Sequence, residues 1–312
     1  MTSRDVVVAI DVGGTGIKCA LVSPDGSVQY AERHATGAGR GPDAVVDTIL
    51  DVADGLTGKA RANGLSPVAA GVVVPGVIDE AAGIAVWSAN VGFRDVPLRD
   101  LVSERLDLPA ALGHDVRAGG LAEARLGAGR SARHVLFIAI GTGIAAAYIV
   151  DGRAFAGAHG AAGEIGHIVI RPSGPPCGCG GRGCLEAVAS AAAVARRYAD
   201  AGHLRTEPVT AAGVAALAAG GDPIAEQVWR QTIDALADGL LTGLALFDPE
   251  LVVVGGGLAE AGEDLLAPLR SALHSRLTFH REPLLVRATL GDEAGCLGAG
   301  LLALDLLGGR PS

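Results

Sequence analysis

VVVAIDVGGTGIKCALV, residues 6–22, has the pattern of a strand, a glycine turn and a second strand. Apolar and β-branched residues fill both arms, as in buried strands. The pattern returns at residues 135–150, VLFIAIGTGIAAAYIV, and both turns contain the tetrapeptide Gly-Thr-Gly-Ile. Two similar units this far apart predict two halves of related topology that face one another across a cleft.

Strand and helix patterns alternate along the rest of the chain. Further strands are predicted at 68–74, 108–112, 251–254 and 284–289, and helices at 42–63, 98–106, 116–126, 185–201, 210–219, 223–247, 260–274 and 294–307. This alternation predicts an α/β fold in which the last helix packs back on the first lobe. We therefore expect a smaller lobe at 1–113, joined by the C-terminal helix at about 294–312, and a larger lobe at 114–293.

Composition excludes several classes of protein. The 312 residues carry a net charge of -9 and contain no basic run, which argues against a nucleic-acid partner. The longest uncharged apolar stretch, residues 135–150, is short for a membrane span and has a glycine turn in its middle. The first residues lack the apolar core of a signal peptide. We expect a soluble cytoplasmic protein without a membrane or nucleic-acid partner.

Three of the five cysteines lie within eight residues, as Cys177, Cys179 and Cys184. His167 lies ten residues before Cys177, and the cysteines fall in a run of glycines and prolines from Gly174 to Gly183. Three thiolates and one imidazole form a complete tetrahedral set for Zn²⁺, with no position left for water. The alternative is three buried small residues in a glycine-rich loop. The clustering favours a structural zinc site. Five cysteines with such a cluster, rather than an even disulfide framework, also fit a reducing compartment.

Three glycine turns follow predicted strands: Gly13-Gly14-Thr15, Gly141-Thr142-Gly143 and Gly255-Gly256-Gly257. Glycine turns expose backbone N–H groups and let a polyphosphate approach closely. Each turn alone could be an ordinary hairpin, but three together, with Asp11 beside the first, favour phosphate binding. Neither a P-loop nor a dinucleotide-binding fingerprint is present.

Four polar residues have both a functional and a purely structural explanation. Asp115 lies where a strand meets a helix and could simply cap that helix. Asn90 lies in a predicted turn, which would account for an asparagine. Glu164 and Glu186 bracket the cysteine segment and could be ordinary solvated acids.

Taken in order, these motifs resemble the ROK family (repressor, open reading frame, kinase). The resemblance rests on Asp11-x-Gly-Gly-Thr, Pro75-Gly76, Asn90, His114-Asp115, Gly141-Thr-Gly, Gly163-Glu-x-Gly-His167, Cys-x-Cys-x4-Cys-x-Glu186 and Gly255-Gly-Gly. It covers residues 5 to about 305, and the His-plus-three-Cys segment is its most specific part. It implies an actin/hexokinase-like (ribonuclease H-like) fold of two α/β lobes, in which sugar and ATP meet in the cleft.

The resemblance also implies roles for individual residues. Asp115 would be the catalytic base that accepts the proton of a sugar hydroxyl, while Mg²⁺ would be held near Asp11. His167 would serve both as a zinc ligand and as a sugar contact. The residues that the resemblance implies for sugar binding are Asn90, His114, Asp115, Glu164, His167 and Glu186. Those that it implies for nucleotide binding are Asp11, Gly13, Gly14, Thr15, Lys18, Gly141, Thr142, Gly143, Gly255 and Gly256. A homodimer or homotetramer is implied as well.

One departure from the family pattern lies at the centre of the expected site. The sugar kinases of the family usually carry Asn before the catalytic Asp, where this chain has His114. We expect phosphorylation of glucose at its 6-hydroxyl, with N-acetylglucosamine, N-acetylmannosamine, fructose or allose as alternative substrates. A sugar-responsive repressor is disfavoured because the first glycine turn comes too early to leave room for a helix-turn-helix module. A non-catalytic sugar-binding protein is the third possibility, and ATP turnover would distinguish it.

Overall fold

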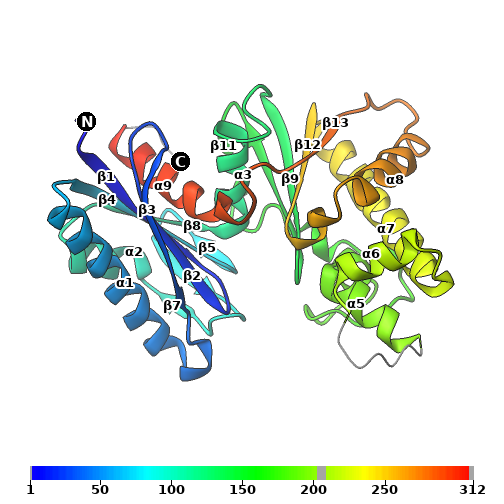
Figure 1. Ribbon diagram of the computed structural model, residues 1–312, viewed down its shortest axis with the longest axis horizontal. Coiled ribbons are helices and arrows are strands. Elements are labelled where there is room, and N and C mark those ends of the chain that lie inside the picture. The colour runs from blue at the N-terminus through cyan, green and yellow to red at the C-terminus, as the bar shows by residue number, and fades with distance from the viewer. Residues whose placement is uncertain (1, 202–208, 309–312) are drawn as a thin grey trace. The chain divides into compact units, whose positions relative to one another are not determined.

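The computed structural model describes residues 2–201 and 209–308 and divides the chain into two compact α/β units (Figure 1). The first unit consists of Met1–Leu126, Gly152–Ala162 and Asp292–Ser312, and the second of Gly127–Asp151 and Gly163–Gly291. The chain therefore leaves the first unit after Leu126, returns to it for Gly152–Ala162, and returns a second time at Asp292 with its last helix.

The first unit is built on a five-stranded sheet with the order β3-β2-β1-β4-β8. Its strands are β1 (Asp5–Val12), β2 (Gly16–Val22), β3 (Val28–Ala35), β4 (Ser66–Val74) and β8 (Ala110–His114). The first three form an antiparallel meander, whereas β1, β4 and β8 run parallel. A small antiparallel sheet follows β4, formed by β5 (Val77–Asp79), β6 (Ile84–Trp87) and β7 (Arg94–Val96).

Helices cover both faces of this sheet. Alternate residues of β1 point to opposite sides, as a period of two requires. Val6, Val8 and Ile10 pack in the cluster that contains α1 (Pro42–Ala62) and α2 (Leu98–Leu106). Val7 and Ala9 pack in the cluster that contains α3 (Asp115–Arg125) and α9 (Ala294–Leu307). The short helix η1 (Ala38–Arg40) precedes α1.

The last helix lies beside the first strand, as Figure 1 shows by their red and blue ribbons. Glycines make this close approach possible, because their missing side chains let backbones meet. A Cβ atom on Gly71 of β4 would lie 1.9 Å from the carbonyl oxygen of Ala299, and one on Gly298 would lie 2.1 Å from that of Ala118. These contacts fix α9 against both the sheet and α3.

The second unit repeats the strand arrangement of the first. Strands β10 (Ile144–Val150), β9 (His134–Ile140), β12 (Leu251–Gly255) and β13 (Leu284–Arg287) lie side by side in that order. Strand β9 pairs antiparallel with β10 and parallel with β12, as β1 does with β2 and β4. The predicted relation between the two strand–turn–strand segments is therefore confirmed at the level of topology.

Helices of the second unit pack against that sheet around a single large apolar core. The longest, α7 (Pro223–Phe247), is capped by Asp222, whose carboxylate accepts from the N–H groups of Ile224 and Ala225. The remaining elements are η2 (Ile165–His167), α4 (Leu185–Ala189), α5 (Ala191–Asp200), α6 (Ala211–Ala219), η3 (Gly257–Ala261) and α8 (Glu263–His274), with the two-residue strand β11 (Arg153–Ala154) and η4 (Gly291–Glu293) at the chain crossings.

Most predicted elements are present, with three differences. The helix expected at 185–201 is two helices, because Ser190 adopts an extended conformation and caps α5 through Ala193 N–H. The helix expected at 260–274 starts as η3 and continues as α8 after Gly262, whose φ is 58°. Strand β3 and the small sheet β5–β7 were not predicted, and residues 309–312 of the predicted C-terminal helix lie outside the described residues.

The predicted domain boundary at residue 113 falls inside the first unit. Helix α3 belongs to that unit because it packs along α9. Within residues 2–201 and 209–308, no helix combines the length and the apolar character that a membrane crossing requires.

Replacing Gly298 by alanine tests the close packing of α9. The added methyl group meets the Ala118 carbonyl, so we expect G298A to lower the free energy of unfolding by about 1–3 kcal/mol. The matched control is G58A on the exposed face of α1, where an added Cβ meets nothing within 4 Å. That change should raise stability by about 0.5–1 kcal/mol because alanine favours the helix. Chemical denaturation measures both, and equal effects would contradict the packing argument.

Candidate active site

The first glycine turn lies at the carboxyl end of β1. The N–H of Gly13 donates to the carbonyl of Gly16 at 2.8 Å, and the hydroxyl of Thr36 donates to the carbonyl of Gly13 at 2.6 Å. Within the described residues, the N–H groups of Gly14 and Thr15 have no acceptor. Asn90 lies against this turn, since a Cβ on Gly14 would be 3.5 Å from that of Asn90. The turn therefore offers free amide donors to an anion.

Asp11 ends β1 just before this turn and is 9% exposed. Burial raises the pKa of its carboxyl to about 7; the nearby charge of Lys18 opposes this effect, and that of Asp115 adds to it. The start of α9 lies directly over the carboxylate, because a Cβ on Gly295 would be 2.5 Å from Asp11 Oδ2. A carboxylate held this way gains from a cation beside it.

Lys18 is held between two acids. Its Nζ lies 3.8 Å from Asp11 Oδ2 and 2.5 Å from Asp292 Oδ1. Arg33 contacts the other oxygen of Asp292 at 2.7 Å. The pKa of Asp292 is lowered, first by its hydrogen bond from Lys18 and also by Arg33. Asp292, which no sequence motif indicated, therefore shares Lys18 with Asp11.

His114 and Asp115 stand where β8 passes into α3. The helix cap is His114, whose Nδ1 accepts from the Arg117 N–H at 3.4 Å. Asp115 is the first helical residue, and its Oδ1 accepts from the Val116 N–H at 2.7 Å. Within the described chain its Oδ2 accepts no hydrogen bond. The capping explanation of Asp115 is therefore wrong, and the side chain is 28% exposed.

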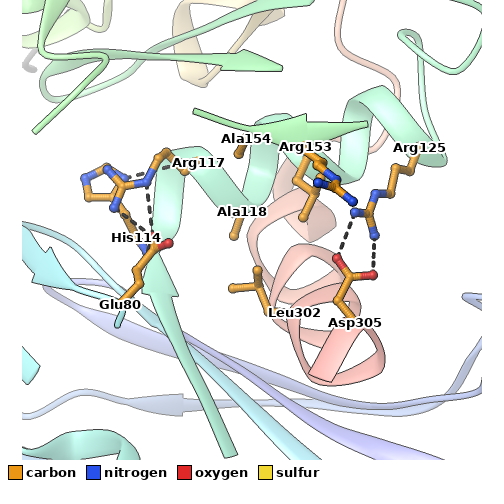
Figure 2. Close-up of a pocket in the computed structure, with 10 residues that line it drawn as sticks. Glu80, His114, Arg117, Ala118, Arg125, Arg153, Ala154, Leu302 and Asp305 are labelled. Atoms are coloured by element: carbon orange, nitrogen blue, oxygen red, sulfur yellow. Dashed lines mark hydrogen bonds and ion pairs between the residues drawn. The ribbon is translucent and has the colours of Figure 1, made fainter. Parts of the chain in front are cut away.

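A partly buried ion pair between Arg117 and Glu80 lies next to His114 (Figure 2). The guanidinium of Arg117 donates to Glu80 Oε1 at 2.7 and 3.1 Å and to the carbonyl of Gly160 at 2.7 Å. Arg117 is only 3% exposed, although it lies on a helix that the sequence analysis treated as ordinary. No sequence pattern indicated this pairing, because Glu80 lies 37 residues away in an irregular turn.

The two glycine turns of the second unit lie at one edge of its sheet. They follow β9 and β12, which pair in parallel up to Gly255 and Ala139. The N–H groups of Thr142, Gly143, Gly256 and Gly257 donate to no acceptor within the described chain. Gly256 has a φ of 79°, and a Cβ there would lie 2.6 Å from the backbone of Ile140. Only glycine lets the third turn lie this close to the second.

Glu186 and Glu164 each have a close polar neighbour within this unit. Glu186 Oε2 accepts from the N–H of Ile144 at 2.9 Å, which fixes the acid beside the second glycine turn. Glu164 Oε2 lies 3.7 Å from Nε2 of His167. Glu186 thus has a specific hydrogen-bond partner, whereas Glu164 is 44% exposed and only approaches His167.

The predicted metal ligands come together. The ligand atoms of His167, Cys177, Cys179 and Cys184 all lie within 4.8 Å of one another. Cys179 Sγ is 3.7 Å from Cys184 Sγ, and Cys177 Sγ is 3.7 Å from His167 Nδ1. Tetrahedral Zn²⁺ with Zn–S bonds of about 2.3 Å places two sulfurs about 3.8 Å apart. The four side chains therefore fit a closed zinc site, and Nε2 of His167 is left to face Glu164.

The predicted residues divide between the units. The first contains Asp11, the first turn, Lys18, Asn90, His114 and Asp115; the second contains the other two turns, Glu164, Glu186 and the four metal ligands. Contacts of these residues with sugar or nucleotide stay predictions. Glu80, Arg117, Asp292 and Thr36 are further residues at these positions that the sequence analysis missed.

The raised pKa of Asp11 predicts how stability depends on pH. Between pH about 4 and 7 the folded protein keeps a proton that the unfolded chain releases, so the free energy of unfolding should fall as pH rises through this range. The loss is at most about 1.4 kcal/mol per pH unit. D11N removes this group and should show a flatter profile. Thermal denaturation without Mg²⁺ or nucleotide measures both, and parallel profiles would contradict the assignment.

Comparison with known proteins identifies a family. The family model described as "ROK family" matches residues 7–306. A glucokinase from Thermotoga maritima is 33% identical and covers 97% of this chain and 98% of the relative. An N-acetylmannosamine kinase from Escherichia coli is 31% identical, covering 95% and 97%, and a xylose repressor from Caldicellulosiruptor bescii is 26% identical, covering 88% and 72%.

Solved structures agree with these relatives. A ROK hexokinase from Thermus thermophilus has a TM-score of 0.85 and 34% identity, covering 97% of this chain and 99% of its own. A ROK family glucokinase from Streptomyces griseus, in complex with glucose and AMPPNP, has a TM-score of 0.81 and 30% identity, covering 96% and 99%. Since the family model spans most of the chain and these relatives cover nearly its full length, the chain belongs to the ROK family and has the actin/hexokinase-like fold of its sugar kinases.

Proposed function

We propose that this protein is an ATP-dependent hexokinase that phosphorylates glucose at its 6-hydroxyl. The observation that carries the proposal is Asp115, a carboxylate at the start of α3 whose Oδ2 has no partner among residues 2–201 and 209–308. The glucokinase relatives, each with 31–33% identity, support it.

Asp115 would act as the base for the attacking hydroxyl. Phosphoryl transfer needs positioning and charge neutralisation more than covalent help from the protein. A carboxylate within hydrogen-bond reach of the hydroxyl orients its oxygen and accepts its proton as the bond to phosphorus forms. In this scheme Oδ1 stays bound to the Val116 N–H, and Oδ2 receives the proton.

The three glycine turns would bind the phosphates of ATP through their free N–H groups. Asp11 and Lys18 would lie at the terminal phosphates. Mg²⁺ bound near Asp11 would neutralise phosphate charge, and it would favour the ionised form of a carboxyl whose pKa is otherwise raised to about 7.

The sugar would contact Asn90, Asp115, Glu164, His167 and Glu186. For His114 a direct sugar contact stays a prediction, and burial favours a supporting role, because its side chain is only 8% exposed and its Nδ1 accepts a helix N–H. Sugar choice would then rest mainly on the other residues.

Zinc would hold the 167–184 loop in place. Bound Zn²⁺ supplies a closed tetrahedral crosslink between η2, the glycine-rich loop and the start of α4. It would fix His167 with Nε2 directed toward Glu164 and the sugar. We further propose a cytoplasmic location, which keeps these thiolates reduced, and a homodimer or homotetramer.

N-acetylmannosamine is the alternative substrate with the most support, since kinases for it are relatives at 31–32% identity. Other hexoses and a non-catalytic sugar-binding role are further alternatives. The xylose repressor has lower identity, and this chain's retained Asp115 and three glycine turns favour catalysis.

Kinase assays on a sugar panel test this function. With Mg-ATP, we expect ADP release to be fastest with glucose, compared with N-acetylglucosamine, N-acetylmannosamine, mannose, fructose and allose. D115N should lower kcat by about 10²–10⁴-fold while glucose binding, measured by calorimetry, persists. Faster ADP release with another sugar would make that sugar, and not glucose, the assigned substrate. Full turnover in D115N would refute the base, and silence on all sugars would refute the kinase.

Loss of one thiolate tests the zinc site. C184S should reduce bound metal from about one Zn²⁺ per chain to near zero and lower the melting temperature. The control is C296S, which changes a similarly buried cysteine that belongs to neither candidate metal group among the described residues and should keep its zinc. Elemental analysis of purified protein gives the metal content, and zinc-free wild-type protein that stays fully stable would contradict the site.

A further inference from the structure

The ion pair between Glu80 and Arg117 joins three segments of the first unit. Glu80 follows β5, Arg117 lies in the first turn of α3, and Gly160 belongs to the segment 152–162. Three donor nitrogens of Arg117 are used, two on Glu80 Oε1 and one on the carbonyl of Gly160. With its side chain 4% exposed, Arg117 is held in one position by these partners.

Contacts lead from this pair to Asp115 in two steps. Glu80 Oε1 also accepts from the backbone N–H of His114 at 3.4 Å. The imidazole Nδ1 of His114 in turn accepts from the Arg117 N–H at 3.4 Å and lies 3.4 Å from Asp115 Oδ1. Glu80 thus contacts the residue before Asp115, and the side chain of Arg117 anchors the helix two residues after it.

A second buried pair on the same helix offers a comparison. Arg125, at the last turn of α3, makes two bonds of 2.8 and 2.7 Å to the carboxylate of Asp305 in α9. Both pairs line one small cavity, with Arg117 at one end and Arg125 at the other (Figure 2). Only the first pair reaches the residues next to Asp115. Buried pairs seldom add net stability over apolar packing, so a positional role is the better physical reason for the first.

We infer that Glu80 and Arg117 are positioning residues that hold Asp115 in place for proton transfer. This inference rests on the proposed function, in which Asp115 is the base. Without the pair, the first turn of α3 keeps its helical hydrogen bonds but loses its attachment to β5 and to the 152–162 segment. Misplacement of a reacting group by about 1 Å can cost roughly 10²-fold in rate.

The two charges should also act in opposite directions on the reaction's pH profile. Among the described residues, His114 of β8 lies 3.4 Å from Asp115 and Asp11 of β1 interacts with it electrostatically, while Glu80 and Arg117 contact His114. E80Q removes a negative charge and should move the acid limb of kcat/KM to lower pH by a few tenths of a unit. R117Q removes a positive charge and should move the limb to higher pH. A purely structural defect would not produce opposite shifts.

The experiment compares E80Q and R117Q with D305N, which breaks the second pair at the far end of α3. We expect E80Q and R117Q to lower kcat by about 10–100-fold with less than a threefold change in the KM for ATP. D305N should lower the melting temperature but leave kcat within about twofold. R117K, which keeps the charge, should recover part of the lost kcat. Equal kcat losses in E80Q and D305N, or shifts of the acid limb in the same direction, would overturn the inference.

Hydrogen exchange separates this inference from the kinase assignment, because it needs no turnover. In E80Q the amides of residues 115–119 should exchange faster than in wild type, while those of 121–126 change little; D305N should show the reverse. Active wild-type enzyme with unchanged exchange and kcat in E80Q would refute the positioning role alone. Wild-type protein inactive on every sugar would refute the base on which positioning depends, whatever exchange shows.

Discussion

Parallel pairing of β1, β4 and β8 is the constraint on which the first unit depends. In a parallel sheet the carboxyl ends of neighbouring strands reach the same edge. Asp11 pairs with Val73, and Val74 pairs with His114. The carboxyl ends of β1 and β8 therefore lie at the same edge of the sheet, with β4 between them. The second unit applies the same rule, because parallel β9 and β12 bring two glycine turns together. Chemistry-bearing residues far apart in sequence are gathered by strand direction alone.

Three settings of charged groups in the first unit are defined by their contacts. Asp11 lies under the start of α9, Glu80 binds Arg117, and Arg125 binds Asp305. Moving such groups out of water is costly unless hydrogen bonds replace the lost solvent. Two of the three settings are bidentate or multiple contacts from arginine, whose planar group suits them. The third has no such partner, and its carboxyl pKa is raised accordingly to about 7.

The metal-ligand loop plays a comparable part in the second unit. Backbone bonds close the loop on itself, as between the Cys177 N–H and the carbonyl of Gly181. Cys184 is the last ligand and also the residue before α4, so two residues later Glu186 reaches the turn after β9. Three consecutive positions of chain, Cys184 to Glu186, therefore connect the cluster of candidate metal ligands to the second glycine turn.

The sequence by itself determined the elements and the motifs with strong local patterns. Buried strands such as β1 and β9, helices such as α7, and the clustering of His167 with three cysteines were all predictable because periodicity and residue spacing are local properties. Strand β3 was not, since its exposed edge position leaves no apolar alternation to detect. Nor was the cap of α3, where the tertiary structure selects His114 over Asp115. The ion pair between Glu80 and Arg117 was decided by the tertiary structure alone. The two residues are far apart in the chain, and the sequence around each contains no pattern that predicts the contact.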